Sequence, residues 1–115
     1  MPRQNHEDKR RFTRFTLILP VRYVNLKTKA EGKARMRDIS DKGIGLEVQE
    51  KLVVQTPLEV WLQMPDGGCF YVRGEVAWSQ KLDESEEYLV GVNLKEAELK
   101  AVQLVIKAMQ SRFNV

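Results

Sequence analysis

The 115-residue chain contains a single cysteine, Cys69, and a single histidine, His6. One cysteine cannot form an internal disulfide, and the pair offers no zinc- or iron-binding pattern such as C-x-x-C or H-E-x-x-H. No nucleophile, base and orienting group stand at a suggestive spacing, and there is no G-x-x-x-x-G-K-[ST] phosphate-binding loop. We therefore expect a protein that is not an enzyme and that holds no metal or cofactor.

Long hydrophobic runs are also missing. No apolar stretch approaches the roughly 18 residues that a membrane-spanning helix needs, and the N-terminal residues lack the apolar middle of a secretory signal. With 43% hydrophobic and 30% charged residues, the composition is typical of a globular protein with one modest core. We expect no membrane insertion and a cytoplasmic location.

Excess positive charge is confined to the first 15 residues. This segment has five basic and two acidic residues, a net charge of +3, which equals the formal net charge of the whole chain. We expect residues 1–15 to form a flexible arm and residues 16–115 to form one domain of balanced charge. An extended DNA or RNA path would need more positive charge than this, so a compact anion is the better match.

Apolar residues recur with period two in six segments bounded by turn residues, which is typical of a small antiparallel sandwich or barrel. The expected strands cover residues 16–25, 33–39, 44–49, 57–64, 70–78 and 88–94. From about residue 96 to 112 the period changes to three and four, which predicts an amphipathic helix with Leu99, Val102, Ile106, Met109 and Phe113 on one face. We predict a mainly all-β fold, a small six-stranded antiparallel β-barrel with a C-terminal amphipathic α-helix, because closure removes exposed sheet edges.

Several positions break the regular alternation. Ile39 should face the core, but strict alternation would then bury Arg37, so we expect a bulge or an outward twist at Arg37 and Asp38. Pro20 requires an edge or a bulge, and Gly74 indicates a sharp bend or bulge in the fifth strand. Trp78 shares the parity of that strand's apolar residues and is assigned to the core.

Two short motifs carry most of the functional information. Arg10 and Arg14 stand four residues apart, so that in a turn or short helix both guanidinium groups would project to one side and clasp one ligand. Lys9 and Arg11 extend this run and are further candidates for ligand contact. A basic tail that only aids solubility is the alternative.

The second motif is Asp38-x-Ser40-x-x-Gly43 at a strand end. Asp38 and Ser40 lie two apart, so both side chains can leave the same face of the barrel. Gly43 permits a positive φ and the close approach of a backbone or ligand. A carboxylate accepts guanine N–H groups and arginine forks match phosphates, so the two motifs indicate a receptor for a guanine-bearing, phosphate-rich ligand. A self-capping hairpin turn is the alternative for the second motif.

Arginines separated as R-x-x-x-R, followed by D-x-S-x-x-G, resemble the two signatures of the PilZ domain, the bacterial receptor module for cyclic di-GMP. The resemblance spans nearly the whole chain and includes Leu19-Pro20-Val21, the segment from Gly43 to Leu46, the segment from Arg73 to Trp78, and Gly91-Val92. It implies that Arg10 and Arg14 bind phosphates and guanine edges, that Asp38, Ser40 and Gly43 hold a guanine on the barrel, and that the arm folds over the nucleotide. In this family the residue before the arginine motif, here Lys9, influences whether one or two stacked nucleotides bind.

Three functions compete at this point. The first is a cyclic di-GMP sensor that signals through an unidentified protein partner. The second is a nucleotide-independent protein–protein adaptor, and the third is a small-barrel binder of single-stranded nucleic acid, which should show a basic groove interleaved with aromatics. Arg35 and Arg37 either add phosphate contacts or are solvated, and Trp61 is either a partner-facing residue or partly covered by a loop or the helix.

Overall fold

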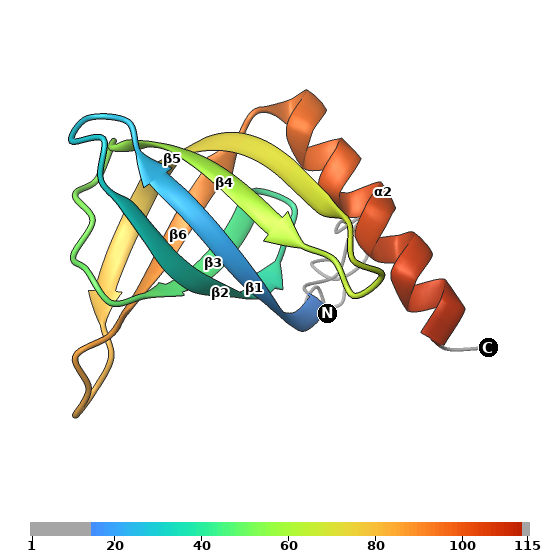
Figure 1. The fold of residues 1–115 in the computed structure, drawn as a ribbon, viewed down its shortest axis with the longest axis horizontal. Helices are drawn as coiled ribbons and strands as arrows, with labels where there is room; N and C mark the ends of the chain where they lie inside the picture. Colours follow the sequence, from blue (N-terminus) through green and yellow to red (C-terminus); the bar gives the residue numbers. More distant parts are fainter. Residues whose placement is uncertain (1–14, 114–115) are drawn as a thin grey trace, which may run out of the picture.

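Six antiparallel strands close into a barrel in the computed structural model, which describes the backbone of residues 15–113 and the side chains of residues 18–108 (Figure 1). The strand order around the barrel is β1-β2-β3-β6-β5-β4, and β4 pairs back onto β1. The strands are β1 (Phe15–Asn25), β2 (Glu31–Ile39), β3 (Gly43–Val48), β4 (Pro57–Gln63), β5 (Cys69–Lys81) and β6 (Tyr88–Leu94). The predicted fold is confirmed.

Side chains alternate between the inside and the outside of the barrel, and the inward ones fill it. The alternating apolar residues of β3 and β4 are buried: Ile44, Leu46, Val48, Leu58, Val60 and Leu62. Met64, which has the same parity and follows β4, is partly buried against them. Burying a side chain of this size contributes about 1.5 to 3 kcal/mol. The barrel therefore has one contiguous core, to which all six strands contribute.

The helix α2 (Glu96–Phe113) lies across one end of the barrel (Figure 1). Leu99, Val102 and Ile106 are buried in the barrel's core cluster, which confirms the predicted apolar face. Met109 and Phe113, the last two members of that face, lie outside the described side chains. Within residues 15–113, no helix combines the length and apolarity that a bilayer crossing requires.

Two hydrogen bonds tie α2 to the strands. The Glu98 carboxylate accepts from the backbone N–H of Arg73 on β5 at 2.8 Å. The Gln103 amide Nε2 donates to the backbone carbonyl of Ser40 at 3.0 Å. The helix is therefore connected directly to the turn between β2 and β3, which contains the second sequence motif.

Pro20 sits where the chain tolerates it. The register of β1 with β2 shifts between Thr16 and Leu19, and the pairing of β1 with β4 begins only at Val21. Proline has no N–H to donate to a strand ladder. Pro20 itself pairs with Arg35 in regular register and has no partner on β4. It therefore occupies a locally unpaired edge, one of the two predicted positions, and the bulge lies nearer the start of β1.

Candidate functional site

Four cross-strand neighbours form a row across β2, β3, β6 and β5. Asp38 pairs with Gly45, Gly45 with Gly91, and Gly91 with Trp78. Three interstrand spacings of about 4.8 Å, or roughly 14 Å in total, separate the two ends of the row. A carboxylate and an indole therefore flank two positions that carry no side chain.

A β-bulge turns Asp38 out of the barrel. The register of β2 against β3 shifts between Met36 and Asp38, so Met36 and Ile39 point into the core while Arg37 and Asp38 are half-buried on the outside. A bulge or an outward twist was predicted here from the conflict between Ile39 and Arg37, and the structure has the bulge. The Asp38 carboxylate lies over Gly45, where an added Cβ would stand 2.5 Å from Asp38 Oδ1.

Ser40 and Gly43 close the turn between β2 and β3. The N–H of Ser40 donates to the carbonyl of Gly43 at 3.0 Å, and the N–H of Lys42 donates to Ser40 Oγ at 3.3 Å. The backbone of Gly43 lies so close to the Val92 carbonyl that a Cβ at this position would overlap it. The expected close approach is observed, but the expected positive φ is not, since Gly67 is the glycine with a positive φ among the described residues.

Trp78 was assigned to the core, and this prediction is wrong. The register of β5 against β6 shifts between Val76 and Trp78, so Val76 is buried while Trp78 is 45% exposed. The Trp78 indole lies on Gly91, where an added Cβ would overlap the ring. The bulge falls at Ala77 rather than at the expected Gly74, which pairs with Leu58 and Leu94 in regular register.

The row borders a cavity of about 410 Å³ on the outer face of the barrel. Its lining includes Asp38, Ser40, Lys42, Gly43, Trp78 and Asn93. Small-molecule sites typically measure roughly 300 to 1,000 Å³ and combine apolar surface with a few polar groups. The volume and the lining of this cavity fit that description.

The groups in the cavity suit a planar, hydrogen-bonding ligand that carries negative charge. The Asp38 carboxylate only accepts hydrogen bonds, whereas the Ser40 hydroxyl and the Asn93 amide can donate and accept. The Trp78 ring offers a face for stacking, and the Lys42 ammonium can pair with an anion. Among residues 15–113, no three metal-ligating side chains gather in one place.

Two other cavities have a less selective lining. One of about 510 Å³ near the start of α2 is lined by Arg73 and Lys95 together with Glu75 and Glu98. Another of about 570 Å³ contains three glutamates among its lining residues. Neither contains a residue of the two sequence motifs, and their opposing charges do not favour an anionic ligand.

The clearly raised pKa values in the described part of the chain belong to two tyrosines outside this cavity. Burial, followed by the hydrogen bond to Glu50, raises the pKa of Tyr23. Desolvation and the hydrogen bond to Glu59 raise the pKa of Tyr71. Tyr71 also packs against Trp61 with ring centroids 5.2 Å apart, and Arg22 lies 5.4 Å from the Trp61 ring centroid. Trp61 is therefore partly covered as expected, but by neighbouring strands rather than by a loop or the helix.

The predicted site residues divide into two groups. The structure brings Asp38, Ser40 and Gly43 together in one cavity. Lys9, Arg10, Arg11 and Arg14 lie outside the described residues, so their part in the site stays a prediction. Trp78, Lys42 and Asn93 line the same cavity but were not predicted. A bulge brings Trp78 there and pairing with Gly43 brings Asn93, whereas Lys42 lies within the second motif and could have been found from the sequence.

Comparisons with known proteins agree with this geometry. The sequence matches the family model described as PilZ domain over residues 8–110. The fold is similar to that of Bacillus subtilis inhibitor of motility (MotI/DgrA), with a TM-score of 0.67 and 14% identity over 90% of this chain and 52% of that chain. No curated protein matches the sequence.

YcgR of Escherichia coli gives two further similar structures. YcgR in complex with c-di-GMP has a TM-score of 0.70 and 14% identity over 92% of this chain and 48% of that chain. The PilZ domain of YcgR with c-di-GMP has a TM-score of 0.62 and 14% identity over 93% of this chain and 99% of that chain. The chain thus spans about half the length of MotI and YcgR, and nearly all of the isolated domain. Since the family model covers most of the sequence and the barrel, closing helix and D-x-S-x-x-G corner are all present, the chain belongs to the PilZ domain family.

Proposed function

We propose that this chain binds cyclic di-GMP and that residues 1–15 close over the bound nucleotide. One observation carries the proposal: the backbone register places Phe15 opposite Ile39 and Thr16 opposite Asp38. Paired strands bring opposite Cα atoms within about 4.5 to 5.5 Å. The segment that contains Arg10 and Arg14 therefore leads directly into the corner formed by Asp38 and Ser40.

One guanine occupies the cavity beside Asp38. Its ring and amino N–H groups donate to the carboxylate, while the exposed face of Trp78 offers a stacking surface. Gly45 and Gly91 have no side chains, so the Asp38 carboxylate and the Trp78 indole can lie close against the sheet. Lys42 and the arginines of the arm hold the phosphates, because guanidinium and ammonium groups are the natural partners of these anions.

Related domains support the choice of ligand. YcgR and MrkH are both described in complex with c-di-GMP, and MrkH shares 21% identity with this chain. We propose the same ligand for this chain because both motifs, Arg10 to Arg14 and Asp38 to Gly43, are intact in its sequence.

The expected affinity is micromolar. Fixing about six arm residues costs on the order of 1 to 2 kcal/mol each. Hydrogen bonds to charged groups return roughly 1.5 to 3 kcal/mol each, so several phosphate and guanine contacts offset the ordering. A net binding free energy of about −8 kcal/mol corresponds to a micromolar dissociation constant.

Closure of the arm creates a composite surface of arm, ligand and barrel that a protein partner reads. The domain then acts as a cytoplasmic receptor without enzymatic turnover. Amide hydrogen exchange of residues 6–15 tests the closure, because saturating cyclic di-GMP should slow exchange there. Unchanged exchange in this segment would contradict it.

Calorimetric titration tests the ligand. Cyclic di-GMP should release or absorb heat, whereas GMP, cyclic AMP and a single-stranded RNA oligonucleotide should not bind. Arg10→Ala, Arg14→Ala and Asp38→Ala should each abolish binding while circular dichroism shows an intact fold. A wild-type protein that fails to bind cyclic di-GMP sinks the proposal and favours an adaptor that works without nucleotide.

A further inference from the structure

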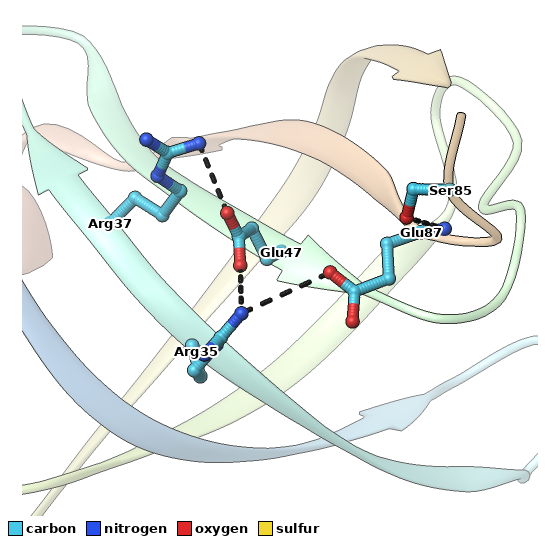
Figure 2. A network of polar contacts seen from close by, with 5 residues as sticks. All are labelled: Arg35, Arg37, Glu47, Ser85 and Glu87. Atoms are coloured by element: carbon cyan, nitrogen blue, oxygen red, sulfur yellow. Dashed lines mark hydrogen bonds and ion pairs between the residues drawn. The ribbon is translucent and has the colours of Figure 1, made fainter. Parts of the chain in front are cut away.

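An ion-pair network of Arg35, Arg37, Glu47 and Glu87 lies on the outer face of the barrel (Figure 2). Its member Arg37 directly precedes Asp38, which lines the proposed nucleotide cavity. Glu47 follows Gly45 by two residues on β3, so both residues face outward. The Glu47 carboxylate contacts Arg37 Nη1 through Oε2 at 3.0 Å and Arg35 Nη2 through Oε1. Its side chain is only 13% exposed, so the two guanidinium groups largely cover it.

The two arginines are held differently. Arg35 sits in regular register opposite Glu47, and it also lies 3.9 Å from Glu87. Arg37 is the extra residue of the β2 bulge, between Met36 and Asp38, and has no register partner on β3. Arg37 is therefore the arginine whose backbone is less constrained, and it directly precedes the residue that we place against guanine.

We infer that Arg37 is a further phosphate ligand of the nucleotide site. Before the ligand binds, Arg37 is paired with Glu47, and on binding it exchanges this carboxylate for a phosphate. This inference rests on the proposed binding of cyclic di-GMP. The bulge directs Arg37 and Asp38 to the same face, so an anion bound beside Asp38 lies within reach of a long, 43% exposed arginine side chain.

The exchange of partners is inexpensive because of the geometry around Glu47. When Arg37 turns to a phosphate, Glu47 keeps its ion pair with Arg35, so no carboxylate is left without a cation. Moving Arg35 instead would break two contacts, one with Glu47 and one with Glu87. Arg37 is therefore the arginine that can leave the network with the loss of a single ion pair.

Affinity should therefore be set by competition between Glu47 and the ligand for Arg37. Removing the charge of Glu47 frees Arg37 and tightens binding, but only if Arg37 is present. A general effect of net charge would tighten binding whether Arg37 is present or not. A double-mutant cycle separates these two causes.

The experiment is a calorimetric titration of cyclic di-GMP into the full chain and into Arg37→Gln, Glu47→Gln, the double variant and Arg35→Gln. Arg37→Gln should weaken binding about tenfold and flatten its dependence on salt. Glu47→Gln should tighten binding about threefold, and this gain should vanish in the Arg37→Gln background. Arg35→Gln, which makes the same charge change in the same network, should alter affinity by less than about threefold.

Two results would overturn the inference while leaving the proposed function intact. One is wild-type affinity in Arg37→Gln, and the other is an equal gain from Glu47→Gln with and without Arg37. A wild-type protein that binds no cyclic di-GMP would overturn the proposed function, and the inference with it. Urea unfolding of each variant tests whether a change in affinity comes from loss of fold.

Discussion

Removing the indole of Trp78 should weaken nucleotide binding more than it weakens the fold. The ring is 45% exposed and lies over Gly91 on the outer face, so few core contacts depend on it. Stacking of a base on an aromatic side chain is worth about 1 to 3 kcal/mol by alanine substitution. Trp78→Ala should therefore raise the dissociation constant for cyclic di-GMP by a factor of roughly 5 to 150.

Trp61 provides a matched control for this prediction. It is the other tryptophan of the chain, and it packs against Tyr71 and Arg22. It does not line the proposed nucleotide cavity. Trp61→Ala should leave the affinity unchanged although it removes a ring of the same size. Trp78→Phe should keep most of the affinity, because a smaller aromatic face remains.

Calorimetry measures the affinities, and tryptophan fluorescence provides a second assay. In Trp61→Phe the remaining indole is Trp78, so cyclic di-GMP should change its emission directly. In Trp78→Phe the remaining Trp61 should not respond. Wild-type affinity in Trp78→Ala, or an equal loss in Trp61→Ala, would refute the reasoning that places a base against Trp78.

Two further predictions concern stability. Gly43→Ala should lower the free energy of unfolding by about 1 to 3 kcal/mol, because its Cβ would overlap the Val92 carbonyl. Gly68→Ala should lower it by less, because its Cβ would lie at an ordinary contact distance of 3.4 Å from Asp66. Equal urea midpoints for the two variants would contradict this prediction. Burial and the Glu50 hydrogen bond raise the pKa of Tyr23 in the folded state, so the stabilisation is complete below the ordinary tyrosine pKa of about 10 and is lost as pH rises above it. Tyr23→Phe should flatten the alkaline fall in thermal stability, and an unchanged pH profile would show that another group titrates there.

The sequence was sufficient to predict the barrel because alternation is a local property of each strand. Inward positions on β4, for example, follow directly from Leu58, Val60 and Leu62. The bulge at Arg37 was also predictable, because strict alternation would have required a buried arginine beside Ile39. An energetic conflict within a single strand was visible without knowledge of its neighbours.

The position of Trp78 could not be predicted in the same way. An indole is compatible with a core position, so no conflict appeared when it shared the parity of Val72 and Val76. Its outward turn depends on the bulge at Ala77 and on the flat surface of Gly91 across the interface with β6. The signal was present only in the combination of Trp78 with a glycine on another strand, and that pairing requires the register.

All three register shifts in the described barrel fall around the same row of residues. They lie between Thr16 and Leu19 on β1, between Met36 and Asp38 on β2, and between Val76 and Trp78 on β5. A bulge disrupts the hydrogen bonds between two strands locally and turns a side chain to the other face of the sheet. In a strand without a function it would only lower the stability of the sheet. Here two of the bulges turn Asp38 and Trp78 outward at either side of paired glycines, and the third lies where β1 meets Asp38. A barrel with strict alternation would have a core that is just as apolar, but at this end it would lack both the carboxylate and the indole. The irregularities of the sheet therefore create the surface that we propose as the nucleotide site.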